Sequence, residues 1–167
     1  KMHPYTGMVI ARIIKELDWE TMFFLAGIFM ILGALNRSGV IESLATLIGS
    51  TFGENILLIY VIIVAMSVLI SGFVDNVPYI ALMLPLIAKV AISTNVEPTV
   101  LYFGLLVGAC LGGNVTPFGA SANIVAVGMA KKNGDPVSFG RFVKAGLPFT
   151  LLTTTVVAIA VWLVWKP

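Results

Sequence analysis

Leu111-Gly112-Gly113-Asn114-Val115-Thr116-Pro117-Phe118-Gly119-Ala120-Ser121-Ala122-Asn123 is the stretch that decides the fold of this chain, because it separates two apolar runs, residues 100–110 and 124–130. Its glycines and its proline end one helix and begin another. Inside a bilayer, backbone groups freed in this way cost several kcal/mol each unless protein or a polar cavity satisfies them. We therefore interpret this break first as a binding site and only second as a kink.

The composition predicts an integral membrane protein that is not an enzyme. Of the 167 residues, 59% are hydrophobic and 11% are charged, whereas a soluble domain carries about 25% charged residues. The net charge of +2 is too small and too dispersed to suggest a nucleic-acid partner. With one cysteine (Cys110), one histidine (His3), no triad signature and no glycine loop with lysine, we expect no catalytic residues, no metal centre and no cofactor.

The pattern of apolar and charged residues predicts two parts, an interfacial segment and a transmembrane transport repeat. Residues 1–18 place apolar and charged side chains at the spacing of an amphipathic helix that lies on the membrane surface. Residues 19–35 form a nearly uncharged run that is just long enough to span the bilayer. We assign residues 19–167 to the transport repeat.

A second polar interruption, Ser71-Gly72-Phe73-Val74-Asp75-Asn76-Val77-Pro78, divides the apolar stretch 56–92. Its second arm, residues 79–92, reaches only about 21 Å as a helix, short of the roughly 30 Å hydrocarbon core. This length predicts a re-entrant helical hairpin over residues 56–92 rather than two full spans.

The remaining transmembrane elements are a broken helix over residues 99–130 and a last span over residues 145–165, with Pro148 in its first turn. We expect the hydroxyls of residues 153–155 to bond back to the helix backbone. Three glycines at four-residue spacing predict close approach of another helix: Gly104, Gly108 and Gly112.

Basic residues gather before the first span and between the last two helices, including Lys131, Lys132, Arg141 and Lys144. The positive-inside rule puts these segments in the cytoplasm, with the protein in a plasma or inner membrane. We expect the lipid bilayer as a partner and a homo-oligomer as the assembly.

Two helix breaks in one bundle are the pattern of a secondary transporter whose site lies between them. The side chains predicted to bind the transported ion are Asp75, Asn76, Asn114, Thr116, Ser121 and Asn123. The positions whose backbone shapes the breaks are Gly72, Pro78, Gly112, Gly113, Pro117 and Gly119.

Asp75 is the acidic residue inside an apolar stretch, where a carboxylate costs about 2.5–3.5 kcal/mol on insertion scales. Such a group takes up a proton or pairs with a cation, so H⁺ or Na⁺ is the expected coupling ion, with a Na⁺ site near Asp75 and Asn114. The alternative is that Asp75 only caps a half-helix. The amides and hydroxyls of the second break either bind the ion or join the broken backbone, and both interpretations remain open.

The two quoted motifs resemble the second-half motifs of the ion-transporter superfamily, nearest to the ArsB/NhaD/P-protein-type permeases, and the likeness covers about residues 19–165. The resemblance implies one inverted-repeat half of an all-α membrane protein, with a re-entrant hairpin, a broken helix and elevator-like movement. It implies that Asp75 and Asn76 occupy the hairpin tip and that residues 114–119 form the unwound link.

Two departures from the superfamily pattern bear on function. Its dicarboxylate carriers usually have Ser-Asn-Thr at the tip, where this chain has Asp75-Asn76-Val77, which favours a cation- or proton-coupled member. A single repeat is present, so we expect a C-terminal repeat whose partner is a missing N-terminal repeat or subunit; assembly of two copies is the other arrangement.

We therefore predict a secondary active transporter, or its C-terminal half, that moves a small inorganic or organic ion across the membrane and is coupled to H⁺ or Na⁺. The alternatives are a passive ion channel and a structural subunit of a split transporter without a site of its own.

Overall fold

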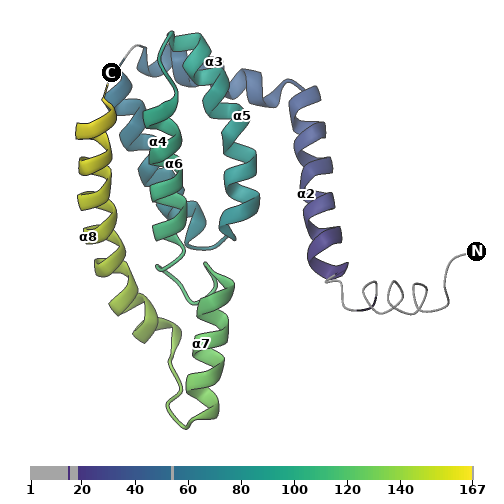
Figure 1. The fold of residues 1–167 in the computed structure, drawn as a ribbon, viewed down its shortest axis with the longest axis vertical. Coiled ribbons are helices and arrows are strands. Elements are labelled where there is room, and N and C mark those ends of the chain that lie inside the picture. The colour runs from purple at the N-terminus through teal and green to yellow at the C-terminus, as the bar shows by residue number, and fades with distance from the viewer. Residues whose placement is uncertain (1–14, 16–18, 54, 167) are drawn as a thin grey trace, which may run out of the picture. The chain divides into compact units, whose positions relative to one another are not determined.

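The computed structural model describes residue 15, residues 19–53 and residues 55–166, and every regular element in these ranges is a helix. The helices are α2 (Trp19–Arg37), α3 (Val40–Phe52), α4 (Ile56–Ser71), α5 (Asn76–Thr94), α6 (Thr99–Gly112), α7 (Ser121–Lys132) and α8 (Phe139–Trp165), as labelled in Figure 1. The prediction of an all-α membrane protein is confirmed. The amphipathic segment predicted over residues 1–18 lies outside the described residues apart from Lys15.

Residues 35–167 form one compact unit, and the following description concerns that unit. Both polar interruptions break the helical structure where the sequence predicts: residues 72–75 separate α4 from α5, and residues 113–120 separate α6 from α7. We call the first break the tip and the second the linker. From the linker, α7 extends away from α4, α5 and α6 (Figure 1), and none of its residues is buried.

Local side-chain chemistry sets where several of these helices begin. A side-chain oxygen accepts a backbone N–H before α4 (Asn55 from Leu58, 3.1 Å), before α5 (Asp75 from Val77, 3.1 Å) and before α8 (Ser138 from Arg141, 3.3 Å). Such caps satisfy N–H groups that have no partner inside the helix.

Two helices extend beyond the apolar runs from which the sequence predicts them. Helix α5 has 19 residues, or about 28 Å at the helical rise, because the Asp75 cap starts it two residues before Pro78 and it continues to Thr94. By length and composition α5 can cross a membrane, as can α8. The length argument for a re-entrant second arm therefore fails, and re-entry into the bilayer stays a prediction.

The last helix also begins earlier than the span that the sequence predicts, which itself stays a prediction. Helix α8 starts at Phe139 rather than at residue 145, because Ser138 caps it and its first turns carry the charged Arg141 and Lys144. Pro148 consequently lies inside the helix and not in its first turn. There it removes one backbone N–H donor, which is a local cause of helix bending.

Helix α4 packs closely against α6 through the three evenly spaced glycines, and the predicted close approach is confirmed. A Cβ at Gly112 would lie 2.7 Å from the Cα of Val68. The same atom at Gly108 would lie 2.6 Å from the Cβ of Ser67, and at Gly104 it would lie 2.6 Å from the Tyr60 ring. Glycine is required here because any side chain would separate the two backbones.

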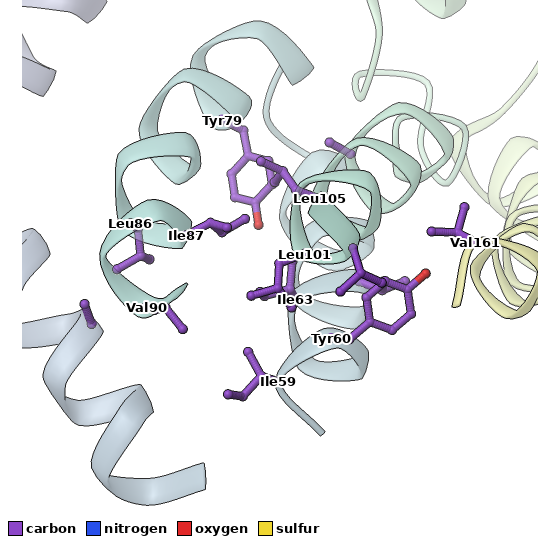
Figure 2. Close-up of a cluster of buried hydrophobic side chains, with 14 of the residues drawn as sticks. Ile59, Tyr60, Ile63, Tyr79, Leu86, Ile87, Val90, Leu101, Leu105 and Val161 are labelled. Carbon is purple, nitrogen blue, oxygen red and sulfur yellow. The ribbon is translucent and has the colours of Figure 1, made fainter. Parts of the chain in front are cut away.

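The apolar core is built from α3, α4, α5, α6 and α8. Figure 2 shows Ile59 and Ile63 of α4, Ile87 of α5 and Leu101 of α6 among its buried side chains. The Tyr60 hydroxyl donates to the carbonyl of Ala158 at 2.9 Å and so ties α4 to α8. This core holds the end of α4 beside the end of α6, and the tip therefore meets the linker.

Candidate ion-binding site

The tip and the linker are in direct backbone contact. The Thr116 hydroxyl donates to the carbonyl of Gly72, across 44 positions of sequence. A Cβ at Gly119 would lie 2.5 Å from the carbonyl oxygen of Gly113 and 2.9 Å from that of Ser71. The two breaks that the sequence predicts therefore form one junction, which is the arrangement on which a shared site depends.

Asp75 stands at this junction between the first turns of two helices. Its Oδ1 accepts the Val77 N–H and caps α5, while its Oδ2 lies 3.4 Å from the hydroxyl oxygen of Ser121 at the start of α7. That second distance is long for a hydroxyl–carboxylate hydrogen bond. Asp75 as a whole residue is half-buried.

Thr116 and Asn123 use their polar side-chain atoms to form hydrogen bonds with backbone groups that the helix breaks leave unpaired. The Thr116 side chain is 1% exposed, and besides donating to Gly72 its Oγ1 accepts the N–H groups of Phe118 (3.2 Å) and Gly119 (3.1 Å). Asn123 Nδ2 donates to the carbonyls of Gly113 (2.9 Å) and Thr116 (3.1 Å). A hydroxyl has one donor and two acceptor sites, so Thr116 has no remaining capacity for an ion.

Asn76 is held in place by a serine that the sequence analysis did not select. The Ser71 hydroxyl donates to Asn76 Oδ1 and lies 2.5 Å from the carbonyl oxygen of Ala109. Ser71 is fully buried, so it links the end of α4, the start of α5 and α6. Its signal in the sequence is a serine that closes an apolar helix five residues before an asparagine.

Asn114 lies on the side of the linker that faces α8. Its Nδ2 donates to the carbonyl of Leu111 at 3.2 Å, and its own carbonyl oxygen would lie 2.3 Å from a Cβ at Gly146 of α8. No side-chain hydrogen bond among the described residues joins Asn114 to Asp75. The Na⁺ site predicted near Asp75 and Asn114 stays a prediction.

The predicted backbone positions shape the junction in different ways. Gly113 lies against Gly119, and a Cβ at Gly113 would be 3.4 Å from Asn76 Oδ1. Gly112 serves the packing of α6 on α4, whereas Pro117 is buried in the linker and Pro78 lies in the first turn of α5. Within the described ranges no group of three or more His, Cys, Asp or Glu side chains could hold a metal ion.

The threonines of α8 divide into two kinds. Thr153 and Thr155 donate back to carbonyls of their own helix at 2.7–2.8 Å, as the sequence predicts. Thr150 and Thr154 are buried, and their hydroxyls have no hydrogen-bond partner among the described residues. The prediction for residues 153–155 is therefore confirmed for two of them and wrong for Thr154, whose hydroxyl is turned into the packed face of α8.

Comparison with known proteins places this chain in a family. The family model described as "Citrate transporter" matches residues 2–167. The chain belongs to the citrate transporter family. The resemblance to the ArsB/NhaD/P-protein-type permeases is confirmed with it, because relatives of this family member include the P protein.

Several curated relatives of this citrate transporter family member are named as transporters. An uncharacterized transporter of Mycobacterium tuberculosis is 35% identical over 161 residues, and one of Synechocystis is 34% identical over 173 residues. These matches cover 95% and 93% of this chain and 38% of each relative. The human P protein is 35% identical over 152 residues, which are 86% of this chain and 18% of that protein. No solved structure matches the chain significantly.

Replacing Thr116 of this family member tests whether its hydroxyl connects backbone groups of the two breaks or binds an ion. Thr116→Val keeps the shape but removes every hydrogen bond of the hydroxyl. We expect unfolding in detergent to need about 1–3 kcal/mol less free energy, because buried backbone groups lose their partner. Thr116→Ser, which keeps the hydroxyl, should retain most of that stability. A stable Thr116→Val protein with a selective loss of ion affinity would contradict the joining role.

Proposed function

We propose that this chain carries the ion-binding site of a secondary active transporter that moves a small ion across the membrane and is coupled to H⁺ or Na⁺. The observation that carries the proposal is the junction of two broken helices, with Asp75 3.4 Å from Ser121 and Thr116 bonded to Gly72. In transporters, such breaks bring helix ends and freed backbone groups to a solute near the middle of the bundle. Membership of a transporter family agrees with this proposal.

A carboxylate-bearing anion is the first candidate substrate, because the family model is described as a citrate transporter. The first turns of α5 and α7 meet at the junction, and helix N-termini attract anions. Asp75 would repel an anion while it is ionised, so anion binding there calls for a proton or a metal cation on the carboxylate. We assign Asp75 the coupling role for this reason.

The rest of the site is proposed to come from outside this chain. The chain covers 38% of the length of the Mycobacterium and Synechocystis transporters, and the apolar side chains of Ile124, Val125 and Met129 on α7 are more than half exposed. A second repeat or subunit packed on α7 would cover them and complete the cavity. We further propose that the basic segment 131–144 faces the cytoplasm.

Accumulation against a gradient tests this proposal. The protein that carries this chain would be reconstituted into vesicles, and uptake of labelled citrate and of Na⁺ measured under imposed pH or Na⁺ gradients. We expect uptake to exceed equilibrium while the driving gradient lasts and to saturate with substrate. Uptake that only equilibrates, and that saturates little, would instead identify a passive channel. No uptake with any tested ion would favour a structural subunit.

A further inference from the structure

A pocket of about 490 Å³ lies between the linker and the first turns of α8. Its wall includes Asn114 of the linker and Arg141, Phe142, Gly146 and Phe149 of α8. None of these side chains but Asn114 belongs to the predicted ion-binding set. We therefore treat this pocket as separate from the predicted ion-binding site.

The segment around this pocket is strongly basic. Residues 131–144 contain four cations, Lys131, Lys132, Arg141 and Lys144, and one anion, Asp135, so the local charge is four minus one, or +3. Arg141 Nη1 donates to Asp135 Oδ1 at 2.9 Å, and the Arg141 side chain is 63% exposed. A guanidinium has five N–H donors, so Arg141 keeps donors for an anionic ligand.

In a span formed by residues 145–165, this pocket would lie at the level of the lipid headgroups. Arg141 and Lys144 directly precede the apolar run of residues 145–165, which as a helix is about 31 Å long and matches the hydrocarbon core. A span positioned in this way puts the Arg141 guanidinium at headgroup level and Phe149, eight residues later, about two turns deeper. Basic pockets between transmembrane helices at this level bind anionic headgroups.

The apolar part of the wall distinguishes a lipid from a free anion. Phe149 is 57% exposed, and it lies on the hydrocarbon side of Arg141 together with Ala145 and Gly146, which also line the pocket. A free phosphate or carboxylate would gain nothing from these groups. A glycerophospholipid places its phosphate beside the cation and its chains along the apolar wall.

We propose that this pocket binds an anionic phospholipid, with the lipid phosphate on Arg141 and the acyl chains along Phe149. The lipid also borders the contact between α8 and the linker, since Gly146 and Asn114 line the pocket and pack against each other. Occupancy stabilises α8 against the linker, so the thermal stability of the protein depends on the headgroup charge of its bilayer.

Nanodiscs of two compositions test the proposal: phosphatidylcholine alone, and phosphatidylcholine with phosphatidylglycerol. Phosphatidylglycerol should raise the thermal unfolding midpoint of the natural protein, and lipid should remain bound in native mass spectrometry. In Arg141→Gln we expect the midpoint shift to vanish and lipid affinity to fall by about tenfold or more, as for the loss of a charge-assisted hydrogen bond.

Two matched variants control this experiment. Asp135→Asn breaks the ion pair with Arg141 but keeps the Arg141 cation, so this variant should keep or enlarge the midpoint shift caused by phosphatidylglycerol. Lys166→Gln removes a cation just beyond the opposite end of α8 and should leave the response unchanged. If Arg141→Gln does not fold, Lys144→Gln takes its place, with a reduced midpoint shift expected.

Three results would overturn the proposal. One is an undiminished phosphatidylglycerol shift in Arg141→Gln, or in Lys144→Gln where that variant replaces it. Another is an equal loss of the shift in Lys166→Gln, which would indicate a general charge effect. The third is the same shift produced by inorganic phosphate in pure phosphatidylcholine nanodiscs, which would assign the pocket to a free anion.

Discussion

Replacing Asp75 by asparagine is expected to abolish coupled transport while leaving the fold intact. Asparagine caps helices about as well as aspartate, so the bond from the Val77 N–H to the side chain at position 75 is retained. The charge that holds a proton or Na⁺ is lost. An amide takes up no proton near neutral pH, so coupling to H⁺ is lost outright. For Na⁺, the loss of one charged partner is worth about 1.5–3 kcal/mol, which predicts an affinity lower by about 10- to 100-fold.

The measurement is uptake in reconstituted vesicles across a range of pH and Na⁺ concentration, alongside a thermal unfolding curve. We expect Asp75→Asn to unfold at nearly the natural temperature and to show no accumulation above equilibrium. Asp135→Asn, which removes an exposed carboxylate in the basic segment, should accumulate substrate normally. Unchanged uptake with unchanged pH and Na⁺ dependence in Asp75→Asn would leave Asp75 as a helix cap only.

Replacing Gly119 by alanine is expected to separate the tip from the linker. The added Cβ would lie 2.5 Å from the Gly113 carbonyl oxygen and 2.9 Å from the Ser71 carbonyl oxygen. Both are backbone atoms of elements fixed by the α4–α6 contact, so a side-chain rearrangement cannot relieve the clash. We expect a loss of about 3 kcal/mol in unfolding free energy, at the upper end for overpacking, and loss of transport with it.

Gly128→Ala is the matched control for this substitution. Gly128 lies in α7, and a Cβ there meets nothing within 4 Å. Alanine in a helix is favoured over glycine by about 0.5–1 kcal/mol, so this variant should be as stable as the natural protein or slightly more so. A Gly119→Ala protein with natural stability and natural uptake would show that the junction tolerates separation of the tip and the linker.

The places where the helices break could be predicted because the signals are local. Glycine, proline and polar side chains at Gly72–Asp75 and at Gly113–Ala120 disfavour a continuous helix wherever they occur. Helix ends were predicted less well. Caps at Asp75 and Ser138 start α5 and α8 earlier than hydropathy suggests, since a cap needs one hydrogen bond and can extend a helix beyond its apolar run.

The polar residues of the two breaks could be selected as candidates from the sequence, but the hydrogen bonds that each of them makes could not be predicted. Asp75 and Ser121 approach each other, whereas the Asn114 side chain donates to Leu111 of α6 and the Thr116 hydroxyl bonds three backbone groups. A polar side chain in a break can bind a solute or satisfy the freed backbone. Which of the two it does depends on the distance to backbone groups elsewhere in the chain.

The sequence by itself determined that this chain is a helical membrane protein with two polar gaps and a glycine face on α6, because hydropathy and backbone propensity act over a few residues. Only the tertiary structure decided which groups share the junction. Gly72 meets Thr116 across 44 positions and Asp75 approaches Ser121 across 46, because α4 lies on the glycines of α6 closely enough to bring the two helix ends to the same level.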